Sequence, residues 1–509
     1  MNTIYKDWFS KWAIYSPDQI AVEEVDTGRH FTYGQINQIA NALTENFLRH
    51  NDLKKGDRVV ILSEHCLEYV VLFSLAQKAG IILVPINFRL TSSEIDYLIK
   101  NCQPGMIICQ DQFADKLEAS KNYNGKFCTM ESFSELCQNI LANSEGSNPH
   151  IQSIDDDHPL FILYTSGTTG FPKGALYTHK MLFWNSVNTS ISLEISASDK
   201  TVTCMPTFHT GGWNVLLTPF LHHGATVFIL KKFDADIVLK CLMEQKIDLF
   251  MAVPTMLKLM AASSHFQNLE LPDLRYIIVG GEALPLQVIE QWAFKNIKIR
   301  QGYGLTEVGP NLTSLHQDDA LQKQGSIGKP NFYVETKLVD DNNNQVGADE
   351  IGEFCIRGNI VTPGYYQNKE ATNKAIIDGW FHTGDLMKMD RDGFLFVVDR
   401  KKSMYISGGE NVYPAEVERV IRQLEAIEEV AIIGVPDNKW GEVGRAFYVV
   451  KQGLQLNLEA LQQHCVAYMA KFKVPKYFER LDSLPKNDSG KIDRNLLKMR
   501  SLESVQIRN

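Results

Sequence analysis

The sequence of 509 residues has little of what marks several common classes of protein. Its nine cysteines are scattered without a Cys-x-x-Cys pair, and it has no His-Glu-x-x-His motif, so it indicates neither a zinc site nor a disulfide framework. Unpatterned thiols are typical of a reducing compartment, and we therefore expect a cytoplasmic protein.

The sequence also predicts no transmembrane span, no signal peptide and no basic surface for nucleic acid. The longest apolar stretch, residues 69–86, is interrupted by Gln77 and Lys78, and it predicts a buried helix followed by a strand. Residues 1–12 contain no long apolar core. Because the net charge is −9, no broad electropositive face is predicted, and small basic clusters such as 400–402 are typical of solvated surfaces.

What the sequence does contain predicts a mixed α/β fold. Between about residues 30 and 300, apolar strand-like runs such as 247–253 and 275–281 are each followed by a helix-like segment, which is typical of parallel sheets covered by helices. Past residue 325, short strands joined by turns favour antiparallel pairing. A last module of about a hundred residues has amphipathic helices beginning at Pro414 and near 458–469, and we expect it to have its own core.

One loop, residues 164–175 (YTSGTTGFPKGA), has the composition of a phosphate-binding loop without the pattern of a P-loop. Counted from Gly167, the P-loop spacing requires Gly-Lys-Ser/Thr at 172–174, but this chain has Pro172, Lys173 and Gly174 there. Pro172 offers no N–H to a phosphate, which argues against an ordinary ATPase. Glycines at positive φ still allow N–H groups to converge on an anion, and an exposed hairpin turn is the alternative.

Four further segments carry polar residues that a buried core does not require: 301–307 (QGYGLTE), 382–385 (HTGD), 399–414 (DRKKSMYISGGENVYP) and 484–494 (LPKNDSGKIDR). Each of them alone also fits a turn or a strand end. Together with the loop 164–175, and in this order, they resemble the adenylate-forming (ANL) superfamily.

The resemblance covers the chain from about Phe31 to Arg494 and is strongest to the branch of fatty-acyl and aryl-CoA synthetases, through residues 208–214 (FHTGGWN) and 406–418 (ISGGENVYPAEVE). It implies a large N-terminal domain at residues 1–400, with parallel-rich sheets, helices and a distorted β-barrel subdomain. A small mobile α+β domain follows at residues 401–509, with its hinge at Lys402.

The resemblance also implies a two-step reaction that uses ATP, Mg²⁺ and CoA. A carboxylate attacks the α-phosphorus of ATP to give an acyl-adenylate and pyrophosphate, and the thiol of CoA then displaces AMP. The loop at 164–175 would hold the departing phosphates. The partners implied are a small carboxylic acid and CoA, without nucleic acid, and a homodimer stays open.

Five residues are implied to be catalytic. Lys491 would bring its charge to the α-phosphate and the carboxylate, Glu307 would bind Mg²⁺, and Thr306 would contact the α-phosphate. His209 would position the carboxylate, and Lys173 would bind the pyrophosphate. The residues implied to bind ATP or AMP are Thr165, Ser166, Gly167, Thr168, Thr169, Gly170, Lys173, Gly281, Glu282, Ala283, Gln301, Gly302, Tyr303, Gly304, Thr306, Asp385, Arg400 and Lys491.

Within that set, Tyr303 would stack on the adenine, and Asp385 would accept hydrogen bonds from the ribose hydroxyls with Arg400 beside it. The residues implied to bind CoA are Arg89, Gly408, Gly409, Phe472 and Lys473. The residues implied to line the acyl pocket are His209, Thr210, Gly211, Trp213 and Gly304.

The acyl pocket favours a medium- or long-chain fatty acid. Gly304 stands where acetate-specific relatives have a Trp, so an open pocket floor is expected, and Gly211 stands where plant coumarate ligases have a Tyr. Trp213 matches a tryptophan that gates the tunnel of some long-chain synthetases, although a position in the core is a strong alternative. A methylene group changes binding in an apolar pocket by only about 1–3 kcal/mol, so the sequence does not fix the chain length.

Several alternatives stay open on the sequence alone. The chain could be an aryl-CoA ligase, or an acyl-adenylate ligase that loads a carrier protein. Members that activate amino acids usually have an Asp where this chain has His209, which argues against an amino-acid substrate. A non-catalytic protein on the same fold would be expected to lose Lys491, Glu307 or Asp385, and all three are present.

Overall fold

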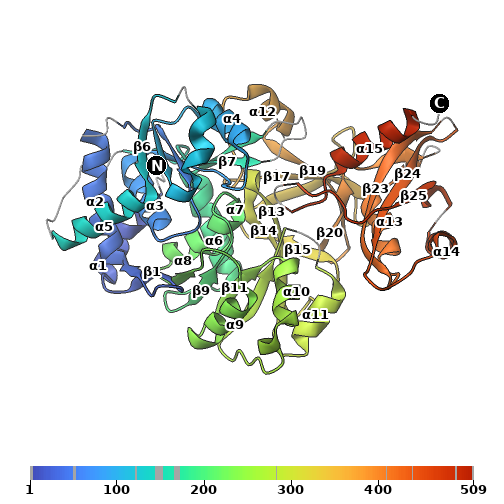
Figure 1. Cartoon of the computed structure of the whole chain (residues 1–509), viewed down its shortest axis with the longest axis horizontal. Coiled ribbons are helices and arrows are strands. Elements are labelled where there is room, and N and C mark those ends of the chain that lie inside the picture. Colours follow the sequence, from blue (N-terminus) through green and yellow to red (C-terminus); the bar gives the residue numbers. More distant parts are fainter. Residues whose placement is uncertain are drawn as a thin grey trace. The chain divides into compact units, whose positions relative to one another are not determined.

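The computed structural model describes residues 4–49, 53–120, 123–143, 153–165, 172–281, 284–407, 410–437, 439–469, 471–487 and 490–506. The chain forms two compact units, coloured along the sequence in Figure 1. The first unit contains residues 1–336 together with 356–382, and the second contains residues 337–355 together with 383–509.

The first sheet of the first unit has the strand order β6-β5-β3-β4-β7-β8. Its strands are β3 (Arg58–Leu62), β4 (Ile82–Pro85), β5 (Met106–Cys109), β6 (Lys126–Thr129), β7 (Pro159–Thr165) and β8 (Lys173–Thr178). All neighbours are parallel except β7 and β8, which form an antiparallel hairpin. Alternate residues of β3 enter different apolar clusters, Val59 with the helix α3 (Glu68–Ala79) and Val60 with the helix α4 (Ser92–Cys102), so helices cover both faces.

The second sheet of this unit has the order β15-β14-β13-β12-β11-β9-β10-β1-β2. Its strands are β1 (Ile20–Glu24), β2 (His30–Thr32), β9 (Lys200–Thr203), β10 (Thr226–Ile229), β11 (Leu249–Ala252), β12 (Tyr276–Val279), β13 (Ile299–Leu305), β14 (Gly309–Leu315) and β15 (Ser326–Pro330). The six neighbouring strands β13, β12, β11, β9, β10 and β1 pair in parallel. In contrast, β2, β14 and β15 are antiparallel to their neighbours. The predicted strands at 247–253 and 275–281 are confirmed as β11 and β12.

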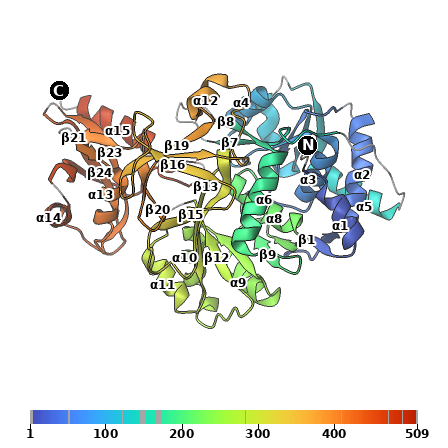
Figure 2. The ribbon, with the colours of Figure 1, turned by 180° about the vertical axis from the view of Figure 1, so that it is seen from behind.

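Helices and short 3-10 turns connect these strands. They are α1 (Trp8–Tyr15), α2 (Tyr33–Arg49), α3 (Glu68–Ala79), α4 (Ser92–Cys102), η1 (Asp111–Ser120), α5 (Met130–Ala142), α6 (His179–Leu193), α7 (Thr210–Asn214), α8 (Leu217–His222), α9 (Ala235–Glu244), α10 (Pro254–Ala262), η2 (Ser264–Phe266), α11 (Leu286–Ala293), η3 (Thr306–Val308) and α12 (Lys369–Ala375), the last followed by the two-residue strand β18 (Ile376–Ile377). The helices α9, α10 and α11 gather beside β11 in Figure 1 and beside β12 in Figure 2, and their apolar side chains share one cluster with β11 and β12.

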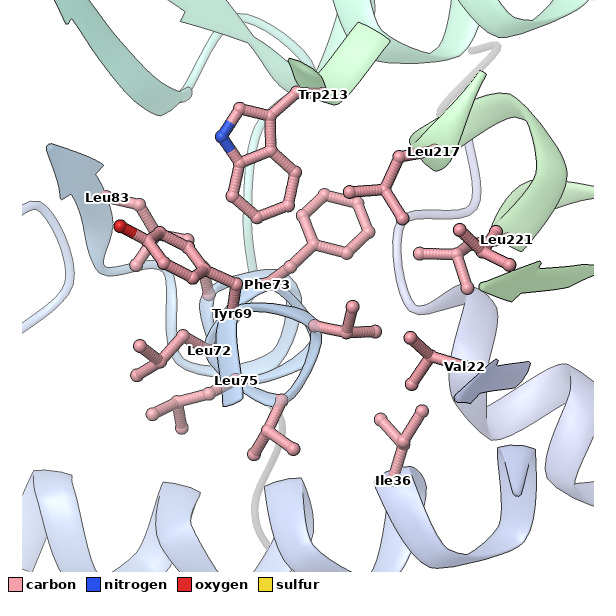
Figure 3. Packing of buried hydrophobic residues seen from close by; sticks show 14 of the residues in the cluster. Val22, Ile36, Tyr69, Leu72, Phe73, Leu75, Leu83, Trp213, Leu217 and Leu221 are labelled. Atoms are coloured by element: carbon pink, nitrogen blue, oxygen red, sulfur yellow. The ribbon is translucent and has the colours of Figure 1, made fainter. Parts of the chain in front are cut away.

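The helix α3 forms the centre of the larger core. All of its residues are buried, which confirms the buried helix predicted from the apolar stretch at 69–86. Figure 3 shows Trp213 turned toward Tyr69 and Phe73 of this helix. The Lys78 ammonium lies inside the same core and donates hydrogen bonds to Asp7 (2.7 Å) and Asn37 (2.8 Å), which offset the cost of burying its charge. Burial still lowers the pKa of Lys78 from its ordinary value.

The second unit contains a run of strands, of which β19 and β20 pair antiparallel, followed by the predicted last module. The strands β16 (Glu335–Val339), β17 (Ile351–Arg357), β19 (Trp380–Met389) and β20 (Leu395–Arg400) lie side by side in this order, and their ends overlap the boundary of the unit. A five-stranded sheet contains β21 (Tyr405–Ser407), β22 (Glu410–Val412), β23 (Ile427–Asp437), β24 (Gly441–Val450) and β25 (Tyr477–Arg480). Its helical segments are α13 (Pro414–Ile421), α14 (Leu458–Tyr468), η4 (Lys471–Lys473) and α15 (Arg494–Gln506).

The last module has its own apolar core, as predicted. Val417 and Ile421 of α13 and Leu461 of α14 pack with β23 and β24. The buried carboxylate of Glu418 accepts hydrogen bonds from the Ile432 N–H (2.9 Å) and from Arg494 (2.6 Å). Burial nevertheless raises the pKa of Glu418.

The mixed α/β class with a large N-terminal sheet region and a small C-terminal region is confirmed. The sheet orders given above are linear, and the distorted β-barrel stays a prediction. The expected domain boundary after residue 400 is defined by the movement of the C-terminal domain. Contacts within one structure do not measure movement, so this boundary also stays a prediction. Across the described part of the chain, no helix combines the length and the apolar composition needed to span a membrane.

Candidate functional site

The hairpin of β7 and β8 fixes the two ends of the predicted phosphate loop. Thr165, the last residue of β7, pairs with Lys173, the first residue of β8, and its hydroxyl donates to the Lys173 carbonyl oxygen (3.4 Å). The predicted donors Ser166, Gly167, Thr168, Thr169 and Gly170 lie outside the described residues. The loop therefore leaves and re-enters the sheet at neighbouring positions, with Lys173 at its base.

A segment at residues 362–366 extends this hairpin on its outer side. The Leu176 N–H donates to the Gly364 carbonyl (3.1 Å), and the Tyr366 N–H donates to the Gly174 carbonyl (2.7 Å). The Thr362 hydroxyl donates to the Leu176 carbonyl (2.7 Å). The segment is thereby held against β8 by backbone and side-chain hydrogen bonds.

The same segment reaches the predicted metal-binding carboxylate. The Thr362 N–H donates to the carbonyl oxygen of Glu307 (2.8 Å), and the Tyr365 hydroxyl donates to Glu307 Oε1 (2.9 Å). The Lys173 ammonium lies over the Tyr365 ring, 5.4 Å from its centroid. Lys173 and Glu307, which lie far apart in the sequence, are thus joined through one tyrosine.

Sequence reasoning missed Tyr365. The signal that could have found it is the Pro-Gly-Tyr-Tyr run at 363–366, because a Pro-Gly pair marks a turn and the two tyrosines follow that turn directly. Gly364 has a φ of +140°, and a Cβ on it would lie 2.4 Å from Thr372 Cγ2. Only glycine fits this turn without strain, and the turn sets the direction of Tyr365.

The predicted adenine site lies where β12 and β13 end side by side. Val279 of β12 pairs with Gln301 of β13, and a Cβ on Gly280 would lie 3.4 Å from the Gly302 carbonyl oxygen. The structure thus brings Gly281 close to the run Gln301, Gly302, Tyr303 and Gly304, which continues into Thr306 at the start of η3. Glu282 and Ala283 lie outside the described residues. Since ligands bind beyond the carboxyl ends of parallel strands, this edge suits a nucleotide.

The two glycines of the predicted acyl pocket have different surroundings. A Cβ on Gly304 would lie 2.4 Å from the carbonyl oxygen of Gly309 and from Pro310, so the backbone of β14 occupies that side. A Cβ on Gly211 would meet only Met251 Cε, at 4.0 Å. Gly304 is therefore explained by close backbone approach, and the room for a side chain lies at Gly211.

His209 caps the helix α7, which carries Thr210, Gly211 and Trp213. Its ring lies 4.6 Å from the Phe208 ring, which in turn contacts Phe88 edge-on at 5.7 Å. The Arg89 guanidinium, predicted to bind CoA, lies over the Phe88 ring at 5.6 Å. A row of aromatic rings thus connects the predicted carboxylate-positioning residue with the predicted CoA residue.

Trp213 lies in the hydrophobic core. Its side chain is fully buried, and its ring lies 4.9 Å from Phe161 and 5.8 Å from both Tyr69 and Phe73. Figure 3 shows these contacts with the α3 residues. This environment is that of a core tryptophan, and the gating role stays a prediction.

In the second unit, Asp385 and Arg400 face each other across β19 and β20. They are register partners, and the Arg400 Nε lies 2.6 Å from Asp385 Oδ1. The neighbouring Asp399 accepts from the Ala415 N–H (2.8 Å) and so joins β20 to the start of α13. Lys402, the predicted hinge, is exposed in the turn that follows β20.

Lys491 lies on a tight hairpin turn of the second unit. The Lys491 N–H donates to the Asn487 side-chain oxygen (3.0 Å), and the Asn487 N–H donates to the Lys491 carbonyl (2.7 Å). Gly490, with a φ of +79°, completes the turn. The backbone of Lys491 is therefore fixed, while its side chain is exposed.

The remaining predicted CoA residues are less informative. Gly408 and Gly409 lie outside the described residues. Lys473 forms an ion pair with Glu416 (2.6 Å) and lies 5.8 Å from the Phe472 ring centroid, which fits a surface cluster as well as a ligand contact.

The donor set at Glu307 fits Mg²⁺ that arrives with a nucleotide. Among the residues that the structure describes, no group of three or more His, Cys, Asp or Glu side chains could hold a metal ion by itself. Magnesium is usually bound by one or two carboxylates together with phosphate oxygens and water. A single carboxylate beside the hydroxyl of Thr306 and near Lys173 meets that description.

Comparison with known proteins shows the family of the chain. Residues 9–366 match the family described as AMP-binding enzyme, and residues 416–491 match the AMP-binding enzyme C-terminal domain. The chain is 34% identical to a long-chain-fatty-acid–CoA ligase of Mycobacterium tuberculosis, over 96% of each chain. It is 33% identical to a feruloyl-CoA synthase of Amycolatopsis, over 95% of this chain and 96% of that protein.

Solved structures agree. The o-succinylbenzoate CoA synthetase (MenE) of Bacillus subtilis, in complex with its acyl-adenylate intermediate, superposes with a TM-score of 0.87 at 29% identity over 98% of this chain and 99% of that chain. The same enzyme in complex with ATP and a magnesium ion superposes with a TM-score of 0.86 at 29% identity, over 97% and 99% of the two chains. The resemblance inferred from the sequence motifs is confirmed, and these relatives are CoA ligases that act on different acids.

Proposed function

Because the chain belongs to the family of AMP-binding enzymes, we propose that it is an ATP-dependent acyl-CoA synthetase for a medium- or long-chain fatty acid. The observation that carries the proposal is the connection of Lys173 with Glu307 through Tyr365, beside the ends of β12 and β13. A cation, a metal-binding carboxylate and an edge suited to a nucleotide thus belong to one unit, as the activation of a carboxylic acid by ATP requires.

In the first step, an oxygen of the substrate carboxylate forms a bond to the α-phosphorus of ATP. The bond from the α-phosphorus to the bridging oxygen breaks, and pyrophosphate leaves. Lys173 and Thr165 hold the departing phosphates, and Thr306 donates to the α-phosphate. Glu307 would hold Mg²⁺, and the bound ion would neutralise phosphate charge. The charge of Lys491 balances the negative charge that builds at the α-phosphate and the carboxylate.

The nucleoside and the acid are held by separate groups. Tyr303 stacks on the adenine, and Asp385 accepts hydrogen bonds from the ribose hydroxyls with Arg400 beside it. His209 positions the carboxylate, since it lies at the start of α7 next to Gly211.

In the second step, the sulfur of CoA forms a bond to the acyl carbon, and the bond to AMP breaks. We assign CoA contacts to Arg89, Gly408, Gly409, Phe472 and Lys473. In this proposal the domain at residues 401–509 turns about Lys402 between the two steps, so that one site serves both reactions.

The acid is the least constrained part of the proposal. The room beside Gly211 is bounded by the apolar Met251, which favours an apolar chain. A feruloyl or succinylbenzoyl substrate, as in the relatives, would make the chain an aryl-CoA ligase. A carrier protein in place of CoA is the other alternative.

The test is a product assay with ATP, Mg²⁺, CoA and a panel of acids: acetate, octanoate, palmitate, benzoate, coumarate, succinylbenzoate and several amino acids. AMP, pyrophosphate and acyl-CoA are measured separately. The proposal predicts AMP and acyl-CoA that depend on octanoate or palmitate. Dependence on an aromatic acid would replace the fatty acid in the proposal, and acid-dependent pyrophosphate without acyl-CoA would point to a carrier protein. ADP as the product would overturn the mechanism.

A further inference from the structure

Tyr365 occupies a position that the proposed chemistry does not yet use. Its side chain is partly buried, its hydroxyl donates to Glu307 Oε1 at 2.9 Å, and its ring lies beneath the Lys173 ammonium. It therefore contacts both the proposed metal-binding carboxylate and the proposed pyrophosphate-binding cation.

The backbone holds Tyr365 in place independently of its side chain. Its N–H donates to the Thr372 hydroxyl (3.0 Å), and it forms a bridge with Ala175 of β8. The residues on both sides are bonded to β8, through the Gly364 carbonyl and the Tyr366 N–H. Because these bonds use backbone atoms, changes to the Tyr365 side chain should leave the segment seated.

The two side-chain contacts have separate physical consequences. A hydrogen bond to one carboxylate oxygen fixes the orientation of the Glu307 group. Removal of a group that orients a metal-binding side chain typically lowers metal affinity by about 10- to 100-fold. An aromatic ring beneath an ammonium holds the cation by electrostatic attraction to the ring face. The hydroxyl thus acts on the carboxylate, and the ring acts on the lysine.

We propose that Tyr365 is a positioning residue of the nucleotide-phosphate site, whose hydroxyl orients Glu307 for Mg²⁺ and whose ring places Lys173 for the pyrophosphate. The proposal rests on the function proposed above and extends it to a residue outside the predicted site. It requires that Tyr365 influence metal binding through Glu307 and the first step of the reaction rather than the second.

The first measurement is metal affinity without turnover. Binding of Mn²⁺ in the presence of α,β-methylene-ATP, which cannot release pyrophosphate, is followed by electron paramagnetic resonance. Tyr365→Phe keeps the ring and the backbone but removes the hydroxyl, and we expect Mn²⁺ affinity to fall on the order of 10- to 100-fold. Tyr366→Phe is the matched control, since the Tyr366 hydroxyl contacts Gln367 (3.3 Å), and its affinity should equal that of the wild type.

A double-mutant cycle separates positioning from general damage. If the hydroxyl acts through Glu307, Tyr365→Phe should have little further effect on Mn²⁺ affinity in the Glu307→Gln background. Equal losses in both backgrounds would overturn the proposal, as would an unchanged affinity in Tyr365→Phe. An equal loss in Tyr366→Phe would overturn it as well.

The second measurement divides the reaction. In Tyr365→Phe we expect slower acid-dependent pyrophosphate exchange, a raised KM for MgATP, and an unchanged rate of acyl-CoA formation from supplied acyl-adenylate. Tyr365→Leu, which also removes the ring, should raise the KM for ATP further. An equal slowing of both half-reactions would overturn the role. Failure of the wild type to form AMP with any acid would instead contradict the proposed function, while the Mn²⁺ measurement still tests Tyr365.

Discussion

Arg400 lies on the solvent side of an ion pair whose other member, Asp385, is nearly closed off from water. The two atoms are 2.6 Å apart, and the exposed fractions of the two side chains are 56% and 4%. A buried carboxylate with a cation beside it can accept hydrogen bonds from two adjacent hydroxyls.

Replacing Asp385 with Asn should weaken ATP binding. The change keeps the shape and removes the charge, and hydrogen bonds to charged groups contribute about 1.5–3 kcal/mol each, so kcat/KM for ATP should fall on the order of 10- to 100-fold. Initial rates against ATP concentration measure this, with Glu425→Gln, an exposed carboxylate of the same unit, as the control. Equal KM values in all three proteins would argue against a ribose contact.

Replacing Lys491 with Ala should strongly slow the formation of the acyl-adenylate and leave the transfer of the acyl group to CoA unchanged. Removal of a preorganised charge at the reacting phosphate typically costs about 100- to 1000-fold, so acid-dependent pyrophosphate release should fall by that factor. Formation of acyl-CoA from supplied acyl-adenylate should continue. Lys486 of the same hairpin pairs with Glu429 (2.7 Å), and Lys486→Ala should leave both half-reactions unchanged. Loss of both half-reactions in Lys491→Ala would contradict the assignment.

The two pocket glycines should respond differently to substitution. Gly211→Leu fills the space toward Met251, and we expect rates with palmitate to fall at least about tenfold relative to octanoate. Gly304→Ala forces the backbone of β14 to move, so we expect lower activity with every acid and about 1–3 kcal/mol less free energy of unfolding. A panel of acids and a urea titration measure the two effects. If the preference between palmitate and octanoate changed only in Gly304→Ala, the floor of the acyl pocket would lie at Gly304 instead.

Stability should depend on pH through His65. Its side chain is buried, neither ring nitrogen has a hydrogen-bond partner within the described chain, and burial lowers its pKa from 6.5 to about 4. Because the folded-state pKa is depressed, the unfolded chain binds more protons below pH 6.5, and the free energy of unfolding falls as the pH drops from about 6.5 toward 4. His65→Leu removes this contribution, so the difference between pH 7 and pH 4 should shrink by up to about 3 kcal/mol. Urea titrations across this range measure it, and identical pH profiles would show that His65 does not contribute.

Local pattern predicted the elements that depend on local chemistry. The apolar stretch at 69–86 gave the buried helix α3, and Pro414 begins α13 because its ring fits a first helical turn. The motif glycines and charges located the edge of β12 and β13 and the base of the phosphate loop.

Features that depend on contacts between distant segments could not be predicted in this way. Gly304 suggested an open pocket floor, but the reason for the glycine is the backbone of Pro310, which pattern does not bring next to it. Trp213 fitted a gate as well as a core position, and its packing against Phe161 places it in the core, while a gating role stays a prediction. Tyr365 escaped notice because its partners come from distant segments, Lys173 from the start of β8 and Glu307 from η3, and meet it only in the folded unit.

Because Lys78 forms an ion pair with Asp7, the core around α3 depends on the segment that begins α1. Lys78 is fully buried on α3, so loss of Asp7 would leave a charge without its partner inside the protein, a defect that typically costs about 3–5 kcal/mol. Asp7 precedes α1 in the chain, whereas Lys78 lies near the end of α3, so α3 is enclosed only once the segment that holds Asp7 has packed against it. Asp7→Ala should therefore lower the yield of folded protein far more than the loss of a polar contact at the surface would.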